Sequence, residues 1–336
     1  MALRSPSGTA RFNTLRRAVL EWSKRNGLFF ALILLVIIFA AVSPRFLTGA
    51  NVTVILLQIS VIGIVAVPGA MLVLSGYVDL SVGSLGALVA ITFGIMAKHI
   101  GVGPAFAVAL AIGVSWGATQ GFIISYFSFS AIVVSLGGLA GLYGVAEFIS
   151  KGLVEYGFGN AFGELGNGTL IGLPVPAWLS FVAFMIGGHF WYRTRYGAHM
   201  AAIGSDKSVA RSLGISVRRI PIVLYMASGF AAALGGLIVT SQLDGSSLSI
   251  GTNLELQVLT AILLGGVAFT GGRGSLFGVL IGVLFTGVLA NGLVVANISP
   301  FLSDAVVGGA LIGAAALDVL YQRLDRIPLR EAGGSE

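Results

Sequence analysis

The chain has 336 residues, of which only 10% are Asp, Glu, Lys or Arg and 56% are hydrophobic. A typical soluble domain has about 25% charged residues, so this composition excludes an ordinary soluble enzyme. The chain has no cysteine, which excludes disulfide scaffolds and cysteine-ligated metal sites. Although the formal net charge is +6, the basic residues lie in short separate blocks, which argues against a nucleic-acid-binding protein. The 49 glycines are typical of closely packed transmembrane helices.

Charge-free runs of suitable length divide the chain into membrane spans, because a transmembrane helix needs about 20 predominantly apolar residues. The fold class that we predict is therefore an all-α, polytopic membrane protein. Its ten helices are predicted at 26–43, 51–73, 80–98, 104–125, 131–149, 174–192, 220–241, 256–272, 274–297 and 303–320.

The positions of the basic residues predict the orientation, since Lys and Arg gather on the cytoplasmic side. With ten spans and a cytoplasmic N-terminus, 16 of the 19 basic residues fall inside. The predicted organisation is a basic cytoplasmic tail, a transmembrane domain and a cytoplasmic C-terminal tail, at 1–25, 26–320 and 321–336 respectively. Within the domain, 193–219 is predicted as a cytoplasmic loop and 150–173 as an outer loop.

Two segments form a weak internal repeat, LVLSGYVDLSVGSL at 72–85 and ILLGGVAFTGGRGSL at 262–276. Duplicated halves with irregular backbone at matching places are common in transporters. The span count puts six helices between the segments, which would make them parallel, whereas an inverted repeat needs an odd separation. The sequence leaves both arrangements open.

The first of these segments has a carboxylate and several serines between apolar runs. A carboxylate at membrane depth is costly and tends to face a cavity or a partner, so this segment is a candidate for the translocation path. The alternative is that Asp79 or Ser81 caps the helix that follows. The candidate path residues are Asp79, Ser81 and Ser84, with Gln120 and Asn291 as weaker candidates.

Two further segments have a functional and a simpler interpretation. The glycine turn Gly271, Gly272, Arg273, Gly274 and Ser275 permits close backbone approach, but it also suits an ordinary hairpin. In the basic loop, Ser205 or Asp206 is predicted to cap a short helix that runs to Leu213 and is closed by Gly214. Such a helix suits docking of a cytoplasmic partner, whereas the simpler alternative is a solvated loop near anionic headgroups.

Motifs for catalysis are missing from the sequence. There is no P-loop, so the chain does not hydrolyse ATP by that route. The GxSxG match at 113–117 lies within a predicted helix, and three scattered histidines do not predict a metal site. The glycine pairs with GxxxG spacing predict helix packing, at Gly117/Gly121, Gly137/Gly141, Gly278/Gly282 and Gly309/Gly313.

Several of these motifs follow one another in an order that resembles a known family. They are DLSVGS at 79–84, the loop at 202–217, Tyr225…Ser228-Gly229…Gly235-Gly236, and Leu264-Gly-Gly…Gly271-Gly-Arg-Gly-Ser275. The series resembles the permease subunits of bacterial ABC importers, in the branch for ribose, xylose, arabinose and galactosides. This chain differs from many relatives at Tyr77-Val78, Ser205-Asp206 and Ser212-Leu-Gly-Ile215.

The resemblance implies an inner-membrane permease, with a second permease copy or a paired paralogue completing the pore. It implies no cofactor in this chain, because a separate ATP-binding subunit binds ATP and magnesium. It also implies that a periplasmic binding protein delivers a sugar and meets the outer loop. The implied ATPase-coupling residues are Gly204, Ser205, Asp206, Lys207, Arg211, Gly214 and Arg218.

Other functions stay open at this point. The same architecture also suits nucleosides, autoinducers or branched-chain amino acids. A stand-alone transporter driven by an ion gradient would depend on an intramembrane carboxylate, first of all Asp79.

Overall fold

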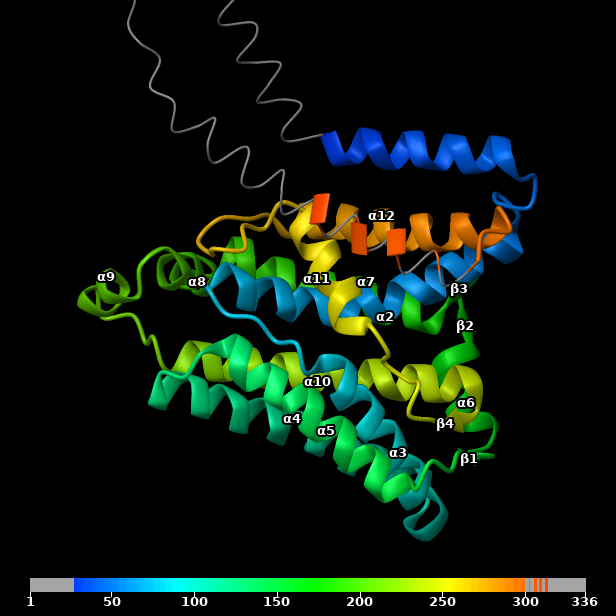
Figure 1. Ribbon diagram of the computed structural model, residues 1–336, viewed down its shortest axis with the longest axis horizontal. Helices are drawn as coiled ribbons and strands as arrows, with labels where there is room; N and C mark the ends of the chain where they lie inside the picture. Colours follow the sequence, from blue (N-terminus) through cyan, green and yellow to red (C-terminus); the bar gives the residue numbers. More distant parts are fainter. Residues whose placement is uncertain (1–26, 300–301, 303–304, 307, 310–311, 314–336) are drawn as a thin grey trace, which may run out of the picture.

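The computed structural model describes residues 27–299 together with 302, 305–306, 308–309 and 312–313. The predicted tails, and most of the helix predicted at 303–320, lie outside the described residues. Within the described ranges the chain is helical, with four strands of two residues each. Figure 1 shows long helices that run between two ends of the molecule.

The helices follow the predicted order, and several continue one or two residues beyond the predicted ends. The first described helix is Gly27–Val42. The helices that follow are α2 Gly49–Leu74, α3 Val82–Ile100, α4 Val102–Phe127, α5 Ala131–Ser150, α6 Asn160–Asn167, α7 Val175–Arg193, α8 Arg195–Ser205, α9 Lys207–Ser212, α10 Arg219–Leu243, α11 Leu254–Leu264 and α12 Leu276–Val295. The strands are β1 Glu155–Tyr156, β2 Thr169–Leu170, β3 Leu173–Pro174 and β4 Gly245–Ser246.

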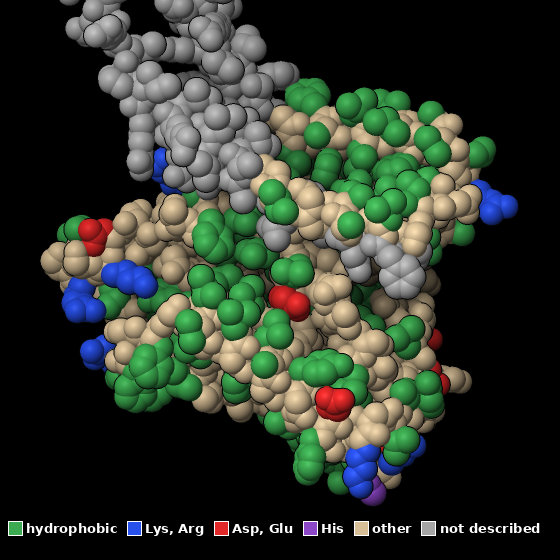
Figure 2. All heavy atoms as spheres, in the orientation of Figure 1, with side chains coloured by type: hydrophobic (Ala, Val, Ile, Leu, Met, Phe, Trp, Pro, Cys, Tyr) green, Lys and Arg blue, Asp and Glu red, His purple; other side chains and the backbone are tan. Residues whose placement is uncertain are grey.

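Six of the described helices are long and apolar enough to cross a membrane, namely α2, α3, α4, α5, α10 and α12. These six make the chain a polytopic membrane protein, while the count of ten spans stays a prediction. Figure 2 shows hydrophobic side chains over the middle of the visible face and Lys and Arg toward its ends. This distribution suits an apolar membrane interior and two aqueous boundaries.

The helix predicted at 256–272 is shorter than expected. It is α11, which ends at Leu264 after 11 residues. At about 1.5 Å per residue it is about 16 Å long, roughly half of a bilayer core of about 30 Å. The chain then turns at Gly266, Gly271 and Gly272, which all have positive φ. The prediction of a full span was wrong, because an uncharged run does not distinguish a helix from a helix followed by a glycine turn.

Two of the helices, α3 and α11, begin inside the molecule after non-helical segments, 75–81 and 247–253. Their first turns touch, since a Cβ added to Gly83 would collide with the Gly251 carbonyl oxygen. From this contact the two helices run apart, as Figure 1 shows. Glycine at both positions therefore lets the two helix starts approach each other backbone to backbone.

The two predicted loops fold at opposite ends. The segment 193–219 forms α8 and α9, and we call this the α9 end (Figure 1). The segment 150–173 contains β1, α6 and β2, and we call this the α6 end. There β1 pairs antiparallel with β4, with Glu155 opposite Ser246, and β2 pairs with β3. Lys98 at the end of α3 forms an ion pair with Glu155 of β1.

Close helix contacts use the predicted glycine pairs in two of the four cases. Gly117 and Gly121 lie against the Ile222–Tyr225 turn of α10, and Gly278 and Gly282 lie against α11. These two predictions of helix packing are confirmed. Gly137 and Gly141 of α5, and Gly309 and Gly313, have no heavy atom of the described residues within 4 Å of a Cβ position.

Candidate functional site

A cavity of about 450 Å³ lies between α2, α10, α11 and α12. Gly86 of α3 and the segment 250–252 close one side of it. This volume falls within the range of about 300–1,000 Å³ that is usual for small-molecule sites. Of the described residues that line the cavity, none is charged, and the polar ones are Gln58, Gln242, Thr252, Gln257 and Thr286.

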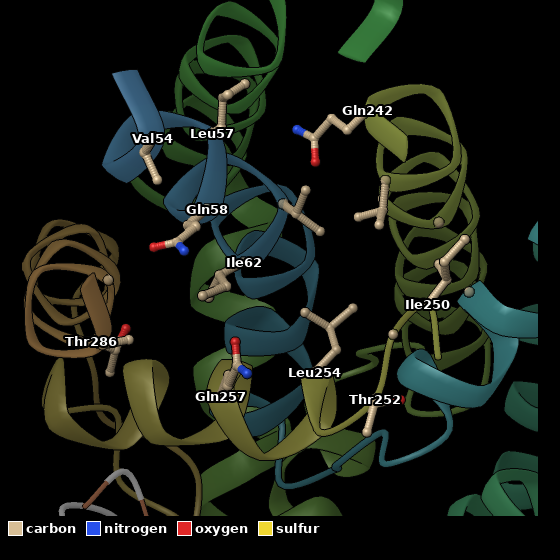
Figure 3. A pocket seen from close by; sticks show the side chains of 18 residues that line it. Val54, Leu57, Gln58, Ile62, Gln242, Ile250, Thr252, Leu254, Gln257 and Thr286 are labelled. Atoms are coloured by element: carbon tan, nitrogen blue, oxygen red, sulfur yellow. The ribbon is translucent and has the colours of Figure 1, made fainter. Parts of the chain in front are cut away.

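Three helices each contribute one glutamine to this lining. Gln58 lies on α2, Gln242 on α10 and Gln257 on α11, and Figure 3 shows their amides around the open space. The Nε2 atom of Gln242 is buried and has no hydrogen-bond partner among the described residues. An unpaired buried amide is costly, so this group is available to a guest molecule.

The chemistry of the lining suits a small neutral polar molecule. Each glutamine amide can both donate and accept hydrogen bonds, as a sugar hydroxyl can. The Thr286 hydroxyl donates to Gly282 O at 3.0 Å and keeps its acceptor capacity. Val, Ile, Leu, Ala and Gly residues supply the remaining surface. The cavity therefore offers dispersed polar contacts in an apolar setting.

Of the predicted path residues, Asp79, Ser81 and Gln120 lie together in one hydrogen-bond network. Asp79 Oδ1 accepts from the Ser81 N–H and the Gln120 amide, each at 3.0 Å. Asp79 Oδ2 accepts from the Ser228 hydroxyl at 2.8 Å. Trp116 Nε1 donates to Ser81 Oγ at 3.0 Å. This network ties the segment 75–81 to α4 and α10.

The other two predicted path residues lie elsewhere. Ser84 is buried in the first turn of α3. Asn291 of α12 exchanges two amide hydrogen bonds with Asn51 of α2, at 2.9 and 3.1 Å. None of the five predicted path residues is among the described residues that line the cavity. Ser81 occupies the N-cap position of α3, but its side chain makes no capping bond there.

The cavity glutamines were missed because the sequence was divided by charge, and glutamine carries none. A usable signal was present for Gln58, which is an isolated amide within an apolar run, whereas Gln242 and Gln257 stand near polar and charged residues. A polar group in such a run is expensive unless it faces a partner or a cavity.

The predicted short helix in the basic loop is confirmed as α9, capped by Asp206. Asp206 Oδ1 accepts from the Ser208 N–H at 2.7 Å and from the Val209 N–H at 3.1 Å. The Ser208 hydroxyl and these N–H groups lower the pKa of Asp206 below its ordinary value. Gly214 follows with a φ of 76°, which ends the helix as predicted.

The basic residues of this loop point in different directions. The Lys207 amine lies 4.1 Å from the centroid of the Tyr77 ring, and burial lowers its pKa. The Arg218 guanidinium lies 5.1 Å from the Tyr126 ring centroid. Arg211 is exposed on α9, and the described residues give it no ion pair. Lys207 is exposed as well, so the two cations of α9 differ in that only Lys207 has a ring contact among the described residues.

Three backbones cross at the α9 end with almost no side chain between them. Gly272 N–H donates to Leu74 O at 2.7 Å, and a Cβ on Gly204 would collide with the same carbonyl. A Cβ on Gly271 would lie 2.9 Å from the Gly76 nitrogen. We call this contact of Leu74, Gly76, Gly204, Gly271 and Gly272 the glycine crossing.

The predicted turn 271–275 therefore both joins α11 to α12 and belongs to the glycine crossing. Ser275 caps α12 by accepting from Gly278 N, and Gly274 lies against Val267. Arg273 is exposed, and its carbonyl accepts from Ala268 N–H at 3.0 Å. The two predicted repeat segments, 72–85 and 262–276, meet here at the same end of the molecule.

Comparison with known proteins places the chain in a family. Residues 51–315 match the family described as "Branched-chain amino acid transport system / permease component". The ribose import permease protein RbsC of Escherichia coli strain K12 is 33% identical over 88% of this chain and 94% of its own length. The D-allose transport system permease protein AlsC of the same strain is 32% identical over 90% and 94% of the two chains. The autoinducer 2 import system permease protein LsrD of Photorhabdus laumondii is 33% identical, over 84% and 86%.

No solved structure matches the chain. The family match covers most of the described helices, and the relatives match over nearly their whole length. The chain is therefore a multi-pass inner-membrane protein of the ABC transporter permease family, a transport subunit rather than an enzyme, with no cofactor of its own.

Proposed function

We propose that this permease imports a neutral sugar and that the sugar passes through the cavity between α2, α10, α11 and α12. The observation that carries the proposal is the lining, with three neutral amides and no charged side chain among the described residues. Two of the similar permeases are named for the sugars ribose and D-allose, which supports this cargo class.

The same lining disfavours an amino acid as the cargo. A zwitterion would bring an ammonium group and a carboxylate into a space that offers neither an acidic nor a basic side chain. Moving an ion out of water without a compensating partner is far more costly than moving a hydroxyl group. A sugar instead exchanges its hydrogen bonds to water for bonds to the glutamines and threonines.

Family membership implies an ATPase and a binding protein as partners, and the two ends of the molecule suit them. The α9 end carries Lys207, Arg211 and Arg218, and we assign it to the cytoplasm and to the ATPase. The α6 end would then face the binding protein. Its helix α6 is held on α10, because Gly166 N–H donates to Ser241 Oγ at 2.9 Å.

We place a second permease copy against α5. The glycines Gly137, Gly141 and Gly144 of this helix have no described heavy atom within 4 Å of their Cβ positions. They lie three and four residues apart, so they form one ridge on the helix. Small residues in a ridge let a second helix approach closely in a membrane.

Uptake measurements in proteoliposomes with the ATPase and the binding protein test the cavity. We expect Gln242→Leu and Gln257→Leu to lower uptake of the sugar about threefold to tenfold, because each removes about one net hydrogen bond. The assay compares labelled ribose, D-allose and leucine. We expect that leucine is not taken up into the proteoliposomes.

A matched pair of threonines controls for general damage. Thr286 lines the cavity and Thr119 of α4 does not, yet each hydroxyl bonds to a carbonyl four residues earlier in its own helix. Thr286→Val should lower uptake and Thr119→Val should not. If the cavity variants assemble and transport like the wild type, the path lies elsewhere. ATP-driven uptake of leucine in place of sugar would refute the cargo class.

A further inference from the structure

Helix α9 contacts the core of the permease through the buried Ala210 and through an aromatic side chain outside the helix. Lys207, the first residue of α9, holds its amine 4.1 Å from the Tyr77 ring centroid. Tyr77 is only 8% exposed and belongs to the non-helical segment 75–81. A cation over an aromatic face is attracted by the electron density of the ring, so the two segments are held together.

The contact continues inward from Tyr77. Its ring meets the Tyr225 ring edge-on, with the centroids 6.3 Å apart and an angle of 76°. Tyr225 is fully buried in α10, and its hydroxyl donates to Val78 O at 2.9 Å. The next residue is Asp79, which binds Ser228 of α10 and Gln120 of α4.

The segment 75–81 then leads directly to the wall of the cavity. It ends where α3 begins, and the first turn of α3 packs Gly83 against Gly251. Gly251, Leu254 and Gly86 all line the cavity. A continuous series of contacts thus joins α9 to the cavity, and Figure 1 shows the segment running from the α9 end into the molecule.

We propose that Tyr77 is a positioning residue that passes the movement of α9 to the cavity, with Lys207 as its contact on α9. The inference rests on the proposed function and adds that two residues of α9 have different roles. Both side chains are exposed, but the Lys207 amine lies over the Tyr77 ring, whereas Arg211 has no ion pair among the described residues and docks the ATPase. Because both are cations of one short helix, substituting each in turn distinguishes transmission of the α9 movement from docking of the ATPase.

The test uses the complete complex of permease, ATPase and binding protein in proteoliposomes, with three measurements. These are co-purification of the ATPase, the rate of ATP hydrolysis, and sugar uptake per ATP hydrolysed. We expect Lys207→Met and Tyr77→Leu to assemble normally and to lower uptake per ATP about fivefold or more, as loss of a coupling free energy would. The double variant should be no worse than either single variant, because both remove the same contact.

Conservative variants keep the proposal testable if Tyr77→Leu fails to fold. Tyr77→Phe keeps the ring and Lys207→Arg keeps the cation, so both should stay within about twofold of wild-type uptake per ATP. Arg211→Met is the matched control on the same helix. It should lower co-purification of the ATPase while the assembled fraction keeps its uptake per ATP.

Each contrary result has a distinct meaning. If Lys207→Met loses the ATPase as Arg211→Met does, with unchanged uptake per ATP, then Lys207 is a docking residue and the inference fails. Unchanged uptake per ATP in Tyr77→Leu, or additive losses in the double variant, also overturns it. A wild-type complex that hydrolyses ATP without importing sugar contradicts the proposed function itself, before any variant is compared.

Discussion

Asp79 shows how a single charged side chain is accommodated inside a membrane protein. Its two oxygens accept hydrogen bonds from Ser81, Gln120 and Ser228, so the carboxylate joins three parts of the chain. Intramembrane carboxylates often serve in proton or ion relays. Here the partners are neutral donors, and their hydrogen bonds to Asp79 hold the segment 75–81 in place.

Substituting Asp79 should therefore reduce the stability of the permease, and transport should still be driven by ATP. Asp79→Ala leaves several buried donors without an acceptor, at a cost of about 1–3 kcal/mol for each. Asp79→Asn retains one oxygen and should lose less. Thermal unfolding of the purified permease measures the loss. Asp244→Asn is the control, because Asp244 caps α10 with positive φ, which asparagine tolerates.

The alternative function, a stand-alone transporter driven by an ion gradient, is tested with the same variants. Uptake in liposomes that lack the ATPase but carry a proton gradient should be absent in the wild type and in Asp79→Asn alike. If Asp79→Asn loses ATP-driven uptake and keeps its full stability, Asp79 belongs to the translocation path instead.

At the level of elements, the contact between the starts of α3 and α11 leaves no space for a side chain at Gly83. A Cβ on Gly83 would collide with the Gly251 carbonyl and with the Glu255 carboxylate. Gly251 itself has a φ of 83°, which disfavours any other residue. Both helices border the cavity, so the contact fixes the cavity wall.

We expect Gly83→Ala to lower the free energy of unfolding by about 1–3 kcal/mol, because overpacking forces neighbouring backbone to move. Uptake should fall with it, since Gly251 lines the cavity. Gly103→Ala in α4 is the control, because its Cβ meets no described heavy atom within 4 Å. Equal stability of the two variants in a thermal unfolding assay would contradict the contact.

The elements also show what the sequence could and could not predict. Long uncharged runs located α2, α4, α5, α7, α10 and α12 to within a few residues, because length and hydropathy alone decide such helices. The early end of α11 was not foreseen, because an uncharged run does not reveal the glycine turn that follows Leu264. The contact between Gly83 and Gly251 was not foreseen either, because the two residues are far apart in the chain. The three cavity glutamines were not predicted either, because they form a polar lining only once the fold brings three helices together.

At the scale of the whole molecule, the positions of the charged residues predicted which segments lie at the two ends. The contacts inside the molecule could not be predicted from the sequence. The α9 helix, its cap and Gly214 were foreseen because capping is local. The approach of Leu74 to Gly204 and Gly272 was not, because no local pattern encodes a contact across such distances. The identity of the partner subunits came from the resemblance to a family, because the residues of one chain do not reveal which proteins bind to it.

Disulfide trapping tests the arrangement of two permease copies, and the chain is well suited to it because it has no cysteine. We expect Gly141→Cys on α5 to give a covalent dimer on oxidation in membranes. Met185→Cys is the control, at a side chain of α7 that is 60% exposed. If both positions cross-link equally, α5 is not the specific interface. If neither does so in intact membranes, this chain pairs with a different permease.

The glycine crossing also bears on how the permease is made. It joins Leu74, Gly204 and Gly272, so it closes only after the chain has been synthesised and inserted as far as Gly272. Membrane helices enter in order from the N-terminus, and α9 emerges well before the backbone that completes its support. On the proposed docking at α9, an ATPase subunit would find a complete docking surface only on a nearly finished permease.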